Sequence, residues 1–258
     1  MGNSRSLYLQ RRGEVAHLII DRPHRRNAFT DEMWPILADL AREADRDDRT
    51  KMMVVRGTDS TVFCAGADVA EWAERLSRGE GGAQNGEMVL AGVSAVADMK
   101  KPTVAAIQGA CMGGGAAISM ACDLRVADRT ARFSLPPARV GLAFPYAALR
   151  SLVAAVGEAQ AKWLLFTGEV FDADRAVQIG FLSAVYEPQF FPSKLDELLT
   201  VMCSMSQISL QSMKAMMKMV ARGQTTDNRE TERIWRELAA GPDHAAGVGA
   251  FLEKWRRL

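Results

Sequence analysis

The 258-residue sequence has few residues of the kinds that hold metals or form disulfide frameworks. It contains three histidines and four cysteines, Cys64, Cys111, Cys122 and Cys203, with no C-x-x-C spacing. Zinc sites and disulfide-stapled folds use more such residues at closer spacing. We therefore expect no metal, and thiols in a reducing compartment, which favours a cytoplasmic protein.

The sequence also lacks an excess of positive or negative charge and has no long apolar run. The formal net charge is +1, and residues 41–49 mix acidic and basic side chains, as a solvated helix end does. This balance predicts no binding to nucleic acid or to a membrane surface. No apolar segment reaches the length of a membrane-spanning helix, and the N-terminus has no hydrophobic signal core.

The first half of the chain alternates apolar runs with amphipathic segments. Strands are predicted at residues 14–21, 51–57, 101–109 and 124–128, the first in a hairpin with 6–11. Helices are predicted at 27–44 and 86–99, the former with Thr30 and Asp31 as capping residues and Pro35 in its first turn. The alternation favours an α/β core with largely parallel strands.

The second half has mainly helical periodicity. The predicted helices are at residues 157–168, 172–180, 193–206, 211–223, 229–241 and 242–258. A methionine stripe at Met213, Met216, Met217 and Met219 fits core or oligomer packing, or an adaptable binding face. We expect residues 1–190 to form the α/β core and residues 191–258 to form a helical C-terminal region.

Two glycine-containing turns follow predicted strands. In CMGGGAAISMACD (111–123), the glycines at 113–115 precede a helix of small residues, without the lysine of a P-loop or dinucleotide-binding spacing. Free N–H groups at a helix N-terminus suit an anionic oxygen, although glycines also permit close packing of helix on sheet. FCAGAD (63–68) favours the first interpretation, because oxyanion holes usually combine N–H donors from two loops.

Five segments together point to one known family. They are RPHRRNAF (22–29), FCAGAD (63–68), PTVAAIQGACMGGGAAISMACDLRVA (102–127), FSLPPARVGL (133–142) and GEVFDADRAVQIGFLSAV (168–185). In this order they resemble the enoyl-CoA hydratase/isomerase family, the crotonase superfamily, from about residue 8 to residue 258. The resemblance implies a spiral of ββα units, a C-terminal helical region that forms homotrimers or dimers of trimers, and an acyl-CoA thioester as ligand, with no separate cofactor.

The same resemblance implies site residues. The N–H groups of Ala67 and Gly114 would hold the thioester oxygen. Other residues expected at the bound thioester are Arg25 or Arg26, Ala65, Gly66, Asp68 and Gly113. The segment 65–68 would line the adenine and pantetheine portion, and the arginine would meet a CoA phosphate unless it is simply solvated.

The expected proton-transfer groups are missing. Hydration needs one group that activates water and one that protonates the α-carbon, and hydratases of this family use two glutamates. One glutamate lies three residues after the second hole glycine, where this chain has Ala117; the other follows a proline, where this chain has Pro136-Pro137. Ala117 and Pro137 can line the substrate pocket but cannot carry a proton.

Other side chains are candidate replacements. Tyr146 could act as a hydrogen-bonding acid or orient a substrate carboxylate, or it is an aromatic at a helix start. Arg139, near Ser134, could bind a carboxylate or lie at the surface, and Glu71, beside Trp72, could reach the acyl pocket or lie on a helix surface. Asp123 fits a structural role.

Three functions stay open: an atypical hydratase or isomerase, an acyl-CoA decarboxylase, and a catalytically silent acyl-CoA-binding protein.

Overall fold

The computed structural model describes residues 6–79 and 83–255. The chain divides into two compact units, Met1–Thr200 and Val201–Leu258. The first unit contains both β-sheets, and the second is helical in the part that the structure describes.

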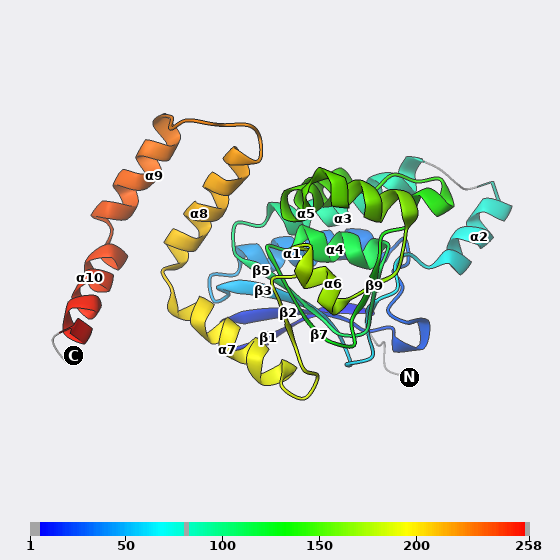
Figure 1. Ribbon diagram of the computed structural model, residues 1–258, viewed down its shortest axis with the longest axis horizontal. Coiled ribbons are helices and arrows are strands. Elements are labelled where there is room, and N and C mark those ends of the chain that lie inside the picture. Colours follow the sequence, from blue (N-terminus) through cyan, green and yellow to red (C-terminus); the bar gives the residue numbers. More distant parts are fainter. Residues whose placement is uncertain (1–5, 80–82, 256–258) are drawn as a thin grey trace. The chain divides into compact units, whose positions relative to one another are not determined.

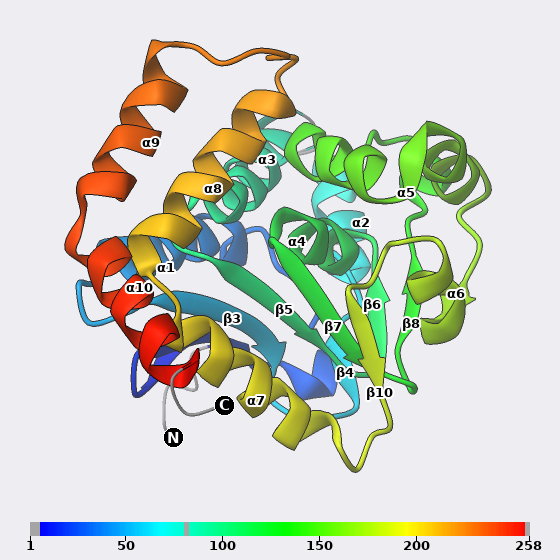
Figure 2. The ribbon, with the colours of Figure 1, turned by 60° about the vertical axis from the view of Figure 1, so that its left-hand side comes forward.

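A six-stranded sheet crosses the first unit, and Figure 2 shows β3, β5 and β7 side by side in it. Its strands, in spatial order, are β1 (Leu7–Arg12), β2 (Val15–Ile20), β3 (Met52–Gly57), β5 (Thr103–Ile107), β7 (Leu124–Asp128) and β10 (Ala184–Tyr186). β1 and β2 form the predicted antiparallel hairpin, and the later neighbours pair parallel. The apolar pattern did not predict β10.

A second, smaller sheet consists of short strands that the apolar pattern also did not predict. In spatial order they are β4 (Val62–Cys64), β6 (Ala110–Met112), β8 (Arg132–Ser134) and β9 (Phe171–Asp172). The strand predicted at 101–109 ends at Ile107, because Gly109 adopts φ +63° and turns the chain into β6. The pairs β3–β4, β5–β6 and β7–β8 each lead into helices, which confirms the spiral of ββα units.

Helices cover both faces of the six-stranded sheet. In the first unit they are α1 (Met33–Arg46), α2 (Val69–Ser77), α3 (Ala83–Asp98), α4 (Gly114–Ala121), α5 (Tyr146–Thr167), α6 (Ala173–Gln178) and the beginning of α7 (Phe191–Ser204). Figure 1 shows α3, α4 and α5 on one side of the strands and α7 on the other. Because both faces are covered, β2, β3 and β5 are apolar nearly throughout instead of alternating.

Helix α1 begins later than its capping pattern predicts. Its first residue is Met33, preceded by Glu32, and no side chain caps it; Pro35 does lie in the first turn. The prediction that Thr30 and Asp31 cap this helix is therefore wrong. The Asp31 carboxylate forms an ion pair with Arg75 of α2, and this long-range partner outweighs a local cap.

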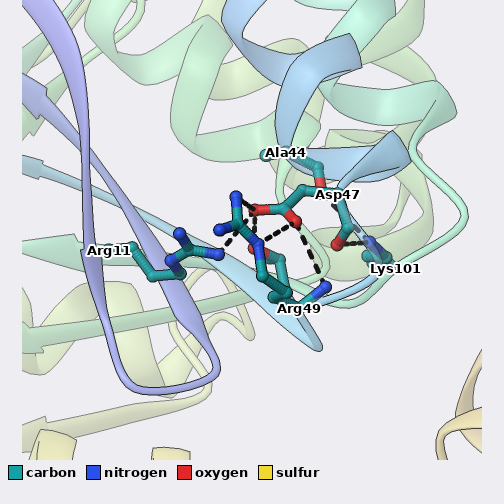
Figure 3. Close-up of polar contacts among 6 residues, drawn as sticks. Arg11, Ala44, Asp47, Arg49 and Lys101 are labelled. Atoms are coloured by element: carbon teal, nitrogen blue, oxygen red, sulfur yellow. Dashed lines mark hydrogen bonds and ion pairs between the residues drawn. The ribbon is translucent and has the colours of Figure 1, made fainter.

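Polar contacts join the end of α1 to the segment before β5 (Figure 3). The ammonium group of Lys101 donates to the carbonyl oxygens of Ala44, at 3.1 Å, and Asp47, at 2.8 Å. The Asp47 carboxylate accepts hydrogen bonds from Arg49 and Arg11, each at 2.9 Å. The Arg49 hydrogen bond is the main reason that the pKa of Asp47 falls to about 2.

The second unit contains α8 (Gln207–Val220), α9 (Arg229–Ala240) and α10 (Pro242–Trp255). Ser206 caps α8, and Asn228 and Thr231 form a capping box at α9. In the methionine stripe of α8, Met213 and Met217 are exposed within the described structure, so the stripe is not wholly core. Among the helices in the described ranges, none has the length and apolar character needed to cross a bilayer.

Candidate active site

The two glycine turns lie against each other. They follow β4 and β6, which are neighbouring parallel strands, so both turns emerge at the same edge of the small sheet. A Cβ atom placed on Gly66 would lie 3.4 Å from the Gly114 nitrogen, and one on Gly114 would lie 3.6 Å from the Ala67 nitrogen. The structure therefore brings together two segments that are almost 50 residues apart in sequence, roughly the length of one ββα unit.

The Ala67 backbone is fixed by hydrogen bonds on both sides. The Phe29 N–H donates to the Gly66 carbonyl, and the Asp68 N–H donates to the Phe29 carbonyl, both at 2.8 Å. The Ala65 N–H donates to the Arg26 carbonyl at 3.0 Å. Within the part of the chain that the structure describes, the Ala67 N–H has no acceptor, and Ala67 is only half-buried. This amide is a free donor held in a rigid frame.

The Gly114 amide occupies the first position of α4, where an N–H has no intrahelical acceptor. Gly113 precedes it with φ +49°, a left-handed conformation that favours glycine, and donates its own N–H to the Ser134 carbonyl at 2.9 Å. Gly114 is half-buried, and its N–H has no hydrogen-bond partner among the described residues. The macrodipole of α4 adds partial positive charge at this point.

The third glycine of the run has a different role. A Cβ on Gly115 would lie 2.5 Å from the carbonyl oxygen of Cys64 and 2.7 Å from its Cβ, so only glycine lets α4 approach the end of β4 this closely. The close-packing interpretation of the glycines is thus confirmed for Gly115, whereas Gly113 and Gly114 form the turn before it. The Cys64 thiol stays neutral, because burial raises its pKa to about 12.

Charged side chains surround the start of α2. Asp68 caps the helix by accepting from the Glu71 N–H, and its carboxylate pairs with Arg22 at 3.2 Å. The Glu71 carboxylate accepts the Asp31 N–H at 3.0 Å. Burial is the main cause that raises the pKa of Glu71, and the Asp31 and Asp68 carboxylates add to it. Glu71, four residues beyond Ala67, is therefore engaged with the segment that precedes α1.

The two expected glutamate positions are apolar in the structure as well. Ala117 is 1 % exposed on α4, and Pro137 is half-buried at the start of a short 3-10 helix. The nearby polar groups are occupied: the Ser134 hydroxyl donates to the Gly168 carbonyl at 3.0 Å, and the Arg139 guanidinium donates to the same oxygen at 3.1 Å. These side chains hold the end of α5.

The remaining residues predicted from the sequence are Tyr146, Arg25, Arg26 and Asp123. Tyr146 begins α5 with its side chain 74 % exposed. Arg25 ends an exposed 3-10 turn, and Arg26 contributes its carbonyl to Ala65. The Asp123 carboxylate accepts from the N–H and hydroxyl of Thr103, which fits the structural role expected of it.

Sequence reasoning did not identify Asn27, which organises the loop beneath the site. Asn27 is fully buried with φ +55°; its side chain accepts the Arg22 N–H at 2.8 Å and donates to the Val62 carbonyl at 2.9 Å. Asparagine tolerates the left-handed region, and its place in RPHRRNAF was the available signal. The described residues include no cluster of three or more side chains suited to a metal ion.

Comparison with known proteins identifies the family. The profile of the enoyl-CoA hydratase/isomerase family matches residues 10–257. A crotonyl-CoA hydratase of Syntrophomonas wolfei is 29% identical over 96% of this chain and 95% of its own length, and a short-chain-enoyl-CoA hydratase of Clostridium acetobutylicum is 28% identical over 96% and 95%. A crystal structure of an enoyl-CoA hydratase/isomerase family protein from Hyphomonas neptunium matches with a TM-score of 0.91 at 31% identity, covering 97% of this chain and 96% of that one.

Proposed function

Because the chain belongs to the enoyl-CoA hydratase/isomerase family, we propose that it binds an acyl-CoA thioester and polarises its carbonyl between the Ala67 and Gly114 N–H groups. The observation that carries the proposal is the pair of acceptor-free amides on turns that face each other. Two fixed donors stabilise the negative charge that develops on a thioester oxygen when its α-carbon becomes an enolate. Gly66, Ala65, Gly113 and Asp68 shape the turns, and Arg25 is proposed to meet a CoA phosphate.

The chemistry that follows enolate formation is proposed to be atypical. Ala117 and Pro137 occupy the positions expected for two proton-transferring glutamates, so hydration of an enoyl-CoA lacks its usual acid and base. We therefore expect slow hydration of crotonyl-CoA compared with the hydratases that this chain resembles. Tyr146 is proposed to supply a weak acid or to orient the substrate, and its exposure leaves it accessible to a bound ligand.

The same apolar positions favour one alternative, decarboxylation of a malonyl-type thioester. Loss of CO₂ leaves the electron pair on the α-carbon and forms the enolate directly, so that no base is required. The oxyanion hole then supplies the main stabilisation, and a proton from a weak acid or water completes the reaction. A catalytically silent acyl-CoA-binding protein is the third possibility that the same geometry accommodates.

The proposal is tested by exchanging one backbone donor. Gly114→Pro removes the N–H at the first helical position, where proline is tolerated, and Gly114→Ala adds a similar Cβ but keeps the N–H. If the hole acts as proposed, the proline variant turns over its thioester about 100-fold more slowly than the alanine variant. Equal activities in the two folded variants would overturn the role of Gly114.

The reaction itself is identified by assaying crotonyl-CoA hydration and malonyl-type decarboxylation beside acyl-CoA binding. Binding that raises the melting temperature without turnover of either substrate would leave the silent binding protein; no effect of any CoA ester on the melting temperature would overturn thioester binding. Ala117→Glu with Pro137→Glu should increase hydration, and the matched pair Ala117→Gln with Pro137→Gln should not. Sedimentation would test the homotrimer or dimer of trimers that we also propose.

A further inference from the structure

Trp34 of α1 carries a buried hydrogen-bond donor without an acceptor. Its side chain is 1 % exposed, and Nε1 has no hydrogen-bond partner in the described ranges of the chain. A buried donor left unpaired destabilises the fold, because it has lost its hydrogen bonds to water, and indole N–H groups usually find a partner when buried. This exception needs an explanation, and a ligand acceptor is one.

The indole lies directly against the proposed oxyanion hole. A Cβ on Gly114 would lie 3.1 Å from Cη2 and 3.2 Å from Cζ2 of Trp34, and the same point lies 3.6 Å from the Ala67 nitrogen. Cζ2 is bonded to the ring carbon that carries Nε1. The unpaired donor is therefore two bonds from a ring atom that borders Gly114.

The ring is held in place by its neighbours. Its centroid is 4.7 Å from that of Phe29, the residue that fixes the Ala67 amide. On the α3 side, a Cβ on Gly92 would lie 3.2 Å from Cε3 and 2.9 Å from the Trp34 carbonyl oxygen, so the helix backbone closes over the indole. Tight packing of this kind prevents the side chain from rotating to another acceptor.

We propose that the Trp34 N–H is a specificity determinant that hydrogen-bonds an oxygen atom of the acyl group near the thioester. The acyl oxygens that suit this donor are those of a 3-hydroxyl, a 3-oxo group or a malonyl-type carboxylate, all of which accept a hydrogen bond from a neutral donor. The inference rests on the proposed function, because it takes the thioester oxygen to be held by Ala67 and Gly114. With both expected glutamates replaced by apolar residues, the indole supplies a polar contact for the acyl group that the sequence motifs did not indicate.

The test compares Trp34→Phe with Trp163→Phe, an exposed tryptophan of α5 that serves as the matched control. Calorimetry measures the Kd of 3-hydroxybutyryl-CoA, acetoacetyl-CoA and malonyl-CoA, with butyryl-CoA as the ester without an acyl acceptor. Trp34→Phe should weaken at least one oxygenated ester about tenfold and change the Kd of butyryl-CoA less than twofold. The oxygenated ester that loses most affinity identifies the oxygen. Trp163→Phe should change none of the four constants.

A second measurement keeps the inference testable if Trp34→Phe does not fold. In the wild-type protein the Trp34 indole proton should exchange slowly because it is buried, and its NMR resonance should move downfield with the preferred oxygenated ester but not with butyryl-CoA. An equal loss of affinity for all four esters, or an unmoved resonance, would show that Trp34 only packs. Failure of the wild-type protein to bind any of the esters would instead contradict the proposed function.

Discussion

Arg22 and Asp68 form a largely buried ion pair that ties the loop after β2 to the cap of α2. The two terminal guanidinium nitrogens of Arg22 each lie 3.2 Å from one carboxylate oxygen of Asp68, and the side chains are 14% and 12% exposed. Arg22 also donates to the Ala28 carbonyl, and the Asp68 N–H donates to the Phe29 carbonyl. The pair therefore holds the residue that follows Ala67, and through it the direction of the Ala67 N–H.

Removing one partner of this pair should affect activity as well as stability. Arg22→Met leaves the Asp68 carboxylate largely buried without its counter-charge, and a loss of about 3 kcal/mol in the free energy of unfolding is expected. Because the Ala67 amide loses part of its frame, kcat should fall more than KM rises. Arg22→Lys keeps the charge and should recover part of both losses. Urea unfolding and steady-state kinetics check the two effects, and an unchanged kcat in a folded Arg22→Met protein would contradict the positioning role.

Gly115 and Gly86 make a matched pair for the packing of α4. Both are helical, but a Cβ on Gly115 would overlap the Cys64 backbone, whereas one on Gly86 of α3 would meet nothing within 4 Å. Gly115→Ala should lower the free energy of unfolding by about 2–3 kcal/mol, because α4 must move away from β4. Gly86→Ala should raise it by about 0.5–1 kcal/mol through helix propensity. Chemical denaturation of both variants measures the contrast, and similar values would show that the gap beside Cys64 is easily widened.

The sequence predicted those parts of the fold that have a local signal. The strands β2 and β3 have apolar runs, the Gly13 turn joins β1 to β2, and the glycine run marks the start of α4. The three-residue strands β4, β6 and β8 are too short for any periodicity, so only the family resemblance implied them.

The site was predictable in part for the same reason. The turns at 63–68 and 111–123 were visible as glycine motifs, but the contacts that orient them are not local. Arg22 and Asp68 are 46 positions apart, and Asp31 pairs with Arg75 across 44, so neither partner could be deduced from spacing. Asp31 looked like a helix cap because its local pattern is that of a cap, and the long-range pair with Arg75 decided its structure instead.

Lys101 should stabilise the end of α1 through its buried ammonium group. Its side chain is buried, and it donates to the carbonyls of Ala44 and Asp47 at the end of α1 (Figure 3). The Asp47 carbonyl also accepts the Thr50 N–H at 2.8 Å. Lys101→Met keeps most of the apolar stem but leaves these carbonyls without that donor, and a loss of about 1–3 kcal/mol is expected. Lys100→Met, at the exposed neighbouring position, should change stability by less than about 0.5 kcal/mol. Thermal or urea unfolding distinguishes them, and equal effects would mean that charge alone matters.

His17 should make stability depend on pH in the mildly acidic range. It is 5 % exposed on β2, Nδ1 has no partner among the described residues, and burial lowers its pKa from 6.5 to about 4. Arg12 and Arg56 lower the pKa further, whereas Asp196 of α7 opposes them. Between pH 6.5 and 4 the unfolded chain binds this proton and the folded protein does not. Stability is therefore full above about pH 6.5 and falls as the pH decreases towards 4.

The expected loss from His17 between pH 7 and pH 5 is about 2 kcal/mol in the free energy of unfolding. His17→Leu removes the titrating group from the same buried position, so its stability should vary less over this range than that of the wild-type protein. His24→Gln, in the exposed turn after β2, should keep the wild-type dependence. Urea unfolding at the two pH values gives the comparison. If wild type and His17→Leu lose the same stability, the acid sensitivity comes from carboxylates. His17 is then protonated, or hydrated, to the same extent in the folded protein as in the unfolded chain.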